Sequence, residues 1–97
     1  MQGMGISLQV LEKIQALAEK HHVKKVILFG SRARGDYKKT SDIDLAIEGG
    51  NYSAFVLDVE EFVPTLFMFD IVNLDGSVQD ELRYSIKEEG VLLYEET

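Results

Sequence analysis

"LFGSRARGDYKKTSDIDLAI", residues 28–47, is the stretch that decides how this chain is organised. It starts in an apolar run that stops at Gly30, and it ends in an alternating run that carries Asp42 and Asp44. Between these runs lie Ser31 and a cluster of cationic side chains. We therefore interpret the stretch as two strands joined by a turn, with groups that bind anions beside groups that bind cations.

The two runs have the patterns of a buried strand and a half-buried strand. Residues 26–29, "VILF", are apolar and partly β-branched, as in a strand covered on both faces. In residues 42–47, "DIDLAI", the side chains alternate, so isoleucine and leucine share one face while Asp42 and Asp44 share the other. The second strand is therefore expected to turn one face to a core and to carry two carboxylates on the other.

Helical and extended patterns alternate along the whole chain. This order predicts an α/β (α+β) fold with a small mixed sheet and helices packed against it. The predicted elements are a helix of about fourteen residues capped by Ser7, the strand 26–29, a short helix after Gly30, the strand 42–47, a helix over 52–63 ended by Pro64, a strand over 66–74, a helix capped by Ser77 and stopped by Gly90, and a strand over 91–94.

Length and composition narrow the class of protein. A chain of 97 residues has the size of one compact core, so we expect a single domain over residues 1–97. No apolar run approaches the ~20 residues of a membrane span, and the N-terminus lacks a secretory signal pattern, which predicts a cytoplasmic protein with no membrane partner. The absence of cysteine excludes disulfides and cysteine-ligated zinc.

The net charge of -7 is unevenly distributed along the chain. Residues 1–39 hold eight Lys/Arg and three Asp/Glu (+5), whereas residues 40–97 hold two and fourteen (-12). An acidic total argues against strong direct nucleic-acid binding, because phosphate contacts need surplus cations. The cations between Lys24 and Lys39 fit either a local anion-binding patch or a solvated charged loop.

The turn after the first strand has the groups of a phosphate site. Gly30, Ser31 and the start of a short helix before Gly35 can direct backbone N–H groups and a hydroxyl to one point. Arg32 and Arg34 can add positive charge nearby. The turn has neither the Walker pattern nor the three-glycine dinucleotide pattern, and a plain strand-to-helix turn remains the alternative.

Three aspartates supply the groups of a metal site. Asp42 and Asp44 lie side by side on one face of a strand, where their repulsion favours a divalent cation between them, and hard oxygen ligands suit Mg²⁺. Asp70 lies in an apolar strand and joins them if the two strands pair. Together with the turn, these are the groups of a two-metal phosphoryl-transfer site. The alternatives are an exposed polar strand face and a solvent-facing aspartate at a strand end.

The combined pattern, Gly30-Ser31, ten residues, Asp42-Ile43-Asp44 and then the strand of Asp70, resembles the nucleotidyltransferase superfamily that includes DNA polymerase beta. It is most similar to the minimal nucleotidyltransferase (MNT) branch, over nearly the full chain. The resemblance implies a nucleotidyltransferase fold. It also implies transfer of a nucleoside monophosphate, usually AMP, from a nucleoside triphosphate such as ATP to a hydroxyl, with release of pyrophosphate.

The resemblance also implies a role for each matching residue. It implies that Mg²⁺ is bound by the three aspartates, one of which also helps to activate the incoming hydroxyl, and that the turn binds the nucleotide. By position, the metal-binding and catalytic residues are Asp42, Asp44 and Asp70, the activating residue is Asp70, the nucleotide-binding residues are Gly30 and Ser31, and Arg32 and Arg34 match basic positions of the nucleotide site.

No acceptor-binding domain is visible in the sequence. The resemblance implies a helical HEPN-type partner, encoded by the neighbouring gene, in a toxin-antitoxin pair. In such a hetero-oligomer the MNT protein is the antitoxin and adenylylates its partner. Two other functions stay open: a catalytically silent module that inhibits a partner by contact, and an aminoglycoside-type small-molecule nucleotidyltransferase completed by a second subunit.

Overall fold

A four-stranded sheet is the centre of the fold in the computed structural model, which describes residues 5–96. The predicted order of helices and strands is confirmed, and so is the mixed sheet with helices packed against it. The elements are α1 (Leu8–Lys20), β1 (Lys25–Phe29), α2 (Ser31–Arg34), β2 (Ile43–Glu48), α3 (Tyr52–Phe62), β3 (Phe69–Asn73), α4 (Asp80–Glu89) and β4 (Val91–Glu95).

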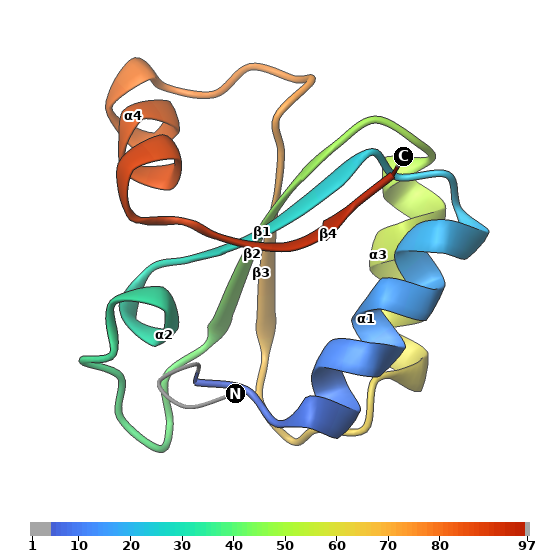
Figure 1. Ribbon diagram of the computed structural model, residues 1–97, viewed down its shortest axis with the longest axis horizontal. Coiled ribbons are helices and arrows are strands. Elements are labelled where there is room, and N and C mark those ends of the chain that lie inside the picture. The colour runs from blue at the N-terminus through green and yellow to red at the C-terminus, as the bar shows by residue number, and fades with distance from the viewer. Residues whose placement is uncertain (1–4, 97) are drawn as a thin grey trace.

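The sheet topology brings three chain segments to one end of the sheet. The strand order is β3-β2-β1-β4, with β1 antiparallel to β2 and β4, and β2 parallel to β3. The C-terminal end of β1 therefore lies beside the N-terminal ends of β2 and β3. Helices α1 and α3 lie on one side of the sheet, and α2 and α4 lie on the other (Figure 1).

The hydrophobic core lies between the sheet and the pair α1 and α3. The alternation predicted for β2 is confirmed, since its apolar face is buried while Asp44 on the other face is only half-buried. Burial of each leucine, isoleucine or valine side chain stabilises the fold by about 1.5–3 kcal/mol. The largest fully buried side chains are Phe55, Ile14, Leu28, Ile43, Leu45, Ile47, Val23, Val26 and Val59.

Several predicted boundaries differ from the structure, most of them by a single residue. Strand β2 begins at Ile43, so Asp42 lies just before it. Strand β3 is shorter than the predicted 66–74, because the apolar side chains before Phe69 face solvent instead of packing on the core. The prediction that Ser77 caps the last helix is wrong, because α4 begins three residues later. Its first turn contains Asp80 and Glu81, whose negative charges interact favourably with the positive end of the helix dipole.

Ionic contacts join α1 to α3. The Nε2 atom of His21 lies 2.7 Å from Oδ2 of Asp58, and the Nζ atom of Lys20 lies 3.0 Å from the same oxygen. The hydrogen bond with His21, and then the one with Lys20, lowers the pKa of Asp58. His21 therefore has a structural contact.

None of the helices in residues 5–96 is long and apolar enough to cross a membrane.

The lowered pKa of Asp58 predicts an acid-dependent loss of stability. A carboxyl group with a depressed pKa in the fold stabilises it above the unfolded-state pKa and loses this effect as pH falls through the folded-state pKa. Asp58→Asn should therefore lower the melting temperature at pH 7. The difference in melting temperature between the variant and the unchanged chain should shrink when the pH falls below 3.8, the ordinary pKa of an aspartate. Calorimetric melting at several pH values measures this difference.

Glu61→Gln is the matched control, because Glu61 is an exposed carboxylate on the same helix α3 as Asp58. It should leave the melting temperature nearly unchanged across the same pH range. Equal melting temperatures for Asp58→Asn and the unchanged chain at neutral pH would contradict a stabilising role of this contact.

Candidate active site

The elements that carry the predicted site residues meet at the end of the sheet where β1 ends and β2 and β3 begin (Figure 1). Asp44 and Asp70 are register partners in the parallel pair of β2 and β3. Phe29, the last residue of β1, is the register partner of Asp44 on its other side. From the sequence, Asp70 was expected to join Asp42 and Asp44 only if the two strands pair, and β2 and β3 do pair. Asp44 and Asp70 therefore project from the same face of the sheet.

The carboxylate of Asp44 is the electrostatic centre of this group. Burial, followed by the negative charges of Asp70 and Asp42, raises its pKa, while Arg34 and Arg32 act in the opposite direction. Asp42 and Asp70 are exposed, whereas Asp44 is half-buried. The site therefore holds a partly desolvated carboxylate between two other negative charges, an arrangement that a bound cation would relieve.

Gly30 lies directly against Asp44. Its φ of 75° and ψ of -156° belong to a region of backbone conformation that is essentially restricted to glycine. A Cβ atom built on Gly30 would collide with Oδ2 of Asp44. Both the backbone conformation and the available space therefore require glycine at this position, and the turn brings its backbone against the carboxylate.

The short helix α2 begins immediately after this glycine. The C=O of Gly30 accepts hydrogen bonds from the N–H groups of Ala33 and Arg34, both at 3.1 Å, and Gly35 closes the helix with a left-handed φ of 91°. The first N–H groups of a helix have no carbonyl partner within it, so they are open to an anion. Ser31, the first helical residue, is half-buried at this end.

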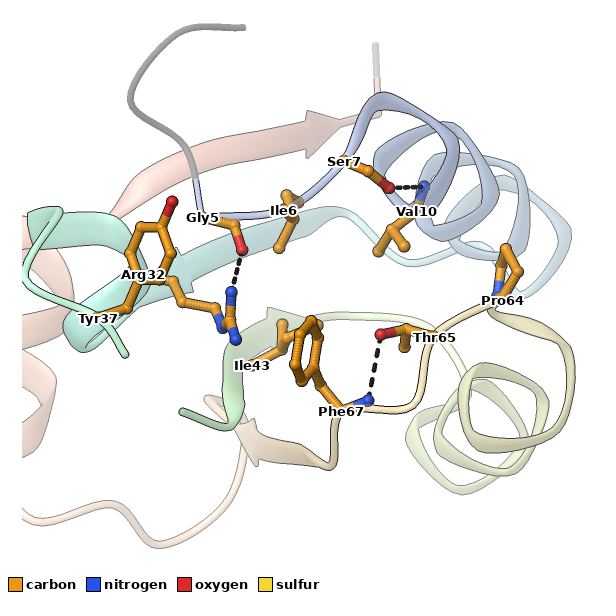
Figure 2. A pocket seen from close by; sticks show the side chains of 10 residues that line it. All are labelled: Gly5, Ile6, Ser7, Val10, Arg32, Tyr37, Ile43, Pro64, Thr65 and Phe67. Atoms are coloured by element: carbon orange, nitrogen blue, oxygen red, sulfur yellow. Dashed lines mark hydrogen bonds between the residues drawn. The ribbon is translucent and has the colours of Figure 1, made fainter. Parts of the chain in front are cut away.

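The two arginines of the turn have different surroundings. Arg32 is only 3% exposed, and its guanidinium lies between the rings of Tyr37 and Phe67, with 4.9 Å and 4.3 Å to their centroids (Figure 2). Its Nε and Nη2 atoms donate to the C=O of Ser41 at 3.1 Å and 2.8 Å, and Nη1 donates to the C=O of Gly5. Arg32 thus holds the residue that precedes Asp42.

Arg34 instead lies on the surface. Its Nε atom is 3.3 Å from Oδ2 of Asp36, and its Nη1 atom is 3.3 Å from Oε2 of Glu89. These two hydrogen bonds raise the pKa of Arg34, so that it stays charged. From the sequence, both arginines were expected in the nucleotide site. The buried position of Arg32 had no sequence signal, because it also depends on Gly5 and Phe67, which are distant in the chain.

A cavity of about 450 Å³ lies beside the guanidinium of Arg32 (Figure 2). Ile43 lines it from the core face of β2, whereas its neighbour Asp44 projects from the opposite face. The cavity and the aspartates are therefore on different sides of the same strand. The lining residues are Gly5, Ile6, Ser7, Val10, Arg32, Tyr37, Ile43, Pro64, Thr65 and Phe67.

The donor set fits a metal site that is shared with a substrate. Within the described part of the chain, no group of three His, Cys, Asp or Glu side chains is placed to hold a metal ion by itself. Mg²⁺ does not require one, because it is usually bound by one or two carboxylates, with phosphate oxygens and waters in the other positions. Asp44 and its register partner Asp70 supply hard oxygen atoms of this kind, with Asp42 next to them.

Comparison with known proteins gives the same fold. The family model "Polymerase beta, Nucleotidyltransferase" matches residues 12–97. A solved structure entitled "Crystal structure of the toxin-antitoxin with AMP-PNP" superposes with a TM-score of 0.68 at 22% identity, over 90% of this chain and 74% of that one. A chain of a Shewanella oneidensis complex, "tri-AMPylated Shewanella oneidensis HEPN toxin in complex with MNT antitoxin", gives 0.64 at 20% identity, over 90% and 71%. The predicted nucleotidyltransferase fold is confirmed.

A curated relative from Methanocaldococcus jannaschii carries the name "Putative protein adenylyltransferase MJ0604". It is 46% identical over 52 residues, which are 52% of this chain and 52% of the relative. The match therefore spans about half the length of that protein.

The close approach of Gly30 to Asp44 predicts a coupled effect on stability. Gly30→Ala should lower the free energy of unfolding by about 1–3 kcal/mol, because the new side chain strains the backbone and collides with the carboxylate. Combining it with Asp44→Ala should recover part of this loss, because the colliding group is then absent. Chemical denaturation of the four chains of this double-mutant cycle measures the coupling.

Gly35→Ala is the control, because Gly35 also has a positive φ but no atom lies within 4 Å of a Cβ built there. It should cost less than Gly30→Ala and show no coupling to Asp44→Ala. Additive effects of Gly30→Ala and Asp44→Ala would mean that the turn and the carboxylate are not in contact.

Proposed function

Because the chain belongs to the polymerase beta nucleotidyltransferase family, we propose that it is a Mg²⁺-dependent nucleotidyltransferase that transfers AMP from ATP to a hydroxyl of a partner protein. The observation that carries the proposal is the pairing of Asp44 with Asp70 beside the bare backbone of Gly30. This places metal-binding oxygens next to a turn that can bind phosphate.

Each residue of the site has a role in this reaction. Gly30 leaves space for the phosphates, and Ser31 and the start of α2 donate hydrogen bonds to them. Asp42, Asp44 and Asp70 would hold the metal, which when bound neutralises charge on the phosphates. Arg34 adds positive charge at the surface, and Arg32 supports the site through the loop that it holds.

Asp70 is exposed, so an acceptor hydroxyl can reach its carboxylate. The hydroxyl oxygen bonds to the α-phosphorus of ATP as the bond from that phosphorus to the leaving pyrophosphate breaks. The hydroxyl proton passes to Asp70. In-line positioning of the acceptor accounts for much of the rate in such a transfer.

The names of similar proteins support a protein acceptor. The Methanocaldococcus jannaschii relative is named a protein adenylyltransferase, and the Shewanella oneidensis structure pairs an MNT antitoxin with an AMPylated HEPN toxin. For this chain we propose a helical HEPN-type acceptor encoded by the neighbouring gene, in a hetero-oligomer in which this chain acts as the antitoxin. Residues 1–97 act in it as one minimal nucleotidyltransferase domain.

The transfer itself is the test of this proposal. The chain is mixed with the protein of the neighbouring gene, Mg²⁺ and labelled ATP, and mass spectrometry follows AMP on serine, threonine or tyrosine. Transfer should require Mg²⁺, and Asp70→Asn should lower its rate by about 10² to 10⁴, the usual contribution of a general base. Glu48→Gln, at the other end of β2, should leave the rate unchanged.

A different outcome would support the alternative function, in which the chain inhibits its partner by contact alone. In that case the neighbouring protein binds and is inhibited without any label. The double variant Asp42→Asn with Asp44→Asn would then inhibit as well as the unchanged chain.

A further inference from the structure

Four large apolar side chains are exposed in the segment that leads into β3. Their exposed fractions are 50%, 101%, 40% and 70% for Phe62, Leu66, Phe67 and Met68 respectively, and we call them the apolar patch. We propose that the apolar patch docks the acceptor protein, through an apolar segment of that protein flanked by basic residues, and holds its hydroxyl beside Asp70. This inference rests on the proposed function.

The apolar patch adjoins the candidate active site. The C=O of Met68 accepts a hydrogen bond from the N–H of Ile43 at 2.9 Å, and Asp70 follows two residues later. Strand β3 is at the edge of the sheet, so its outer side is not covered by another strand. A protein bound to residues 66–68 therefore lies within a few residues of the proposed general base, as the acceptor must.

Hydrogen bonds shape the segment of the patch, and two hollows adjoin it. The Thr65 hydroxyl accepts a hydrogen bond from the N–H of Phe67 at 3.2 Å, and the N–H of Thr65 donates to the C=O of Val63 at 2.9 Å. A hollow of about 310 Å³ lies beside Met68, and one of about 410 Å³ lies beside Phe62. Hollows beside exposed apolar groups suit the anchoring side chains of a partner protein.

Charge decides between the possible occupants. Residues 40–82 contain ten acidic residues and no lysine or arginine, and Glu60 lines the hollow beside Met68. The hollow beside Phe62 is lined by both Lys13 and Glu12, so the negative charge is concentrated at the Met68 end of the apolar patch. Anionic lipid surfaces and nucleic acids are therefore repelled, and so is a second copy of a chain whose net charge is -7. An apolar segment with basic flanks complements both the apolar surface and the negative charge.

The test uses Leu66→Ser combined with Met68→Ser, which alters two exposed residues outside the strands and should leave the fold intact. Calorimetry measures binding to the protein of the neighbouring gene. Affinity should fall about ten-fold or more, a loss of about 1.4 kcal/mol, because apolar anchors at the centre of an interface contribute most of its binding energy. In the transfer assay the KM for the acceptor should rise, while Mg²⁺-ATP affinity stays unchanged.

Leu92→Thr is the matched control, because Leu92 is 51% exposed on β4 at the opposite edge of the sheet. It should bind the acceptor normally. Unchanged acceptor affinity in the Leu66→Ser and Met68→Ser variant, or no binding by the unchanged chain, overturns the docking proposal. A dimer of the unchanged chain in sedimentation that the double variant abolishes also overturns it, because the patch then binds a second copy.

The two proposals fail in different ways. Binding that depends on the apolar patch without any transfer of label supports the docking proposal and contradicts the nucleotidyltransferase function. Transfer of label with equal acceptor affinity in the patch variant supports the function and contradicts docking at the patch. Asp42→Asn combined with Asp44→Asn should bind the acceptor without modifying it.

Discussion

The contact between the Gly30 backbone and the Asp44 carboxylate is the constraint on which the candidate site depends. It joins the end of β1 to the start of β2, which are antiparallel neighbours in the sheet. Because Gly30 has no side chain, the turn can approach the Asp44 carboxylate, which already lies near the negative charges of Asp42 and Asp70. A backbone without a side chain at this turn can also be approached by phosphate oxygens, so one glycine serves both the fold and the proposed chemistry.

Arg32 holds this arrangement from the other side of β2. Its guanidinium joins Gly5, ahead of α1, to Ser41, ahead of Asp42, and the ring of Phe67 covers one of its faces. A buried cation held by carbonyl oxygens and aromatic faces is costly to disturb, since each donated hydrogen bond replaces one to water. Phe67 also belongs to the apolar patch, so the proposed docking surface contacts the residue that supports the loop of Asp42.

Most of the fold was predictable because its signals are local. The alternation of β2, the glycine after β1 and the cap of α1 at Ser7 follow from neighbouring residues, and the Ser7 side chain accepts from the N–H of Val10 as expected. The short β3 and the exposed residues before it were not predictable, since an apolar run does not reveal whether anything covers it. The register of Asp44 with Asp70 and the burial of Arg32 depend on contacts between distant segments.

Calorimetric titration of ATP with and without Mg²⁺ tests the central claim most directly, because Asp44 lies where metal and phosphate would meet. The account predicts that each ligand tightens the binding of the other in the unchanged chain, since the cation relieves the repulsion among the aspartates and the phosphates complete its ligands. Asp44→Asn should abolish this coupling while the chain stays folded. ATP binding of equal strength with and without Mg²⁺, in both chains, would contradict the account.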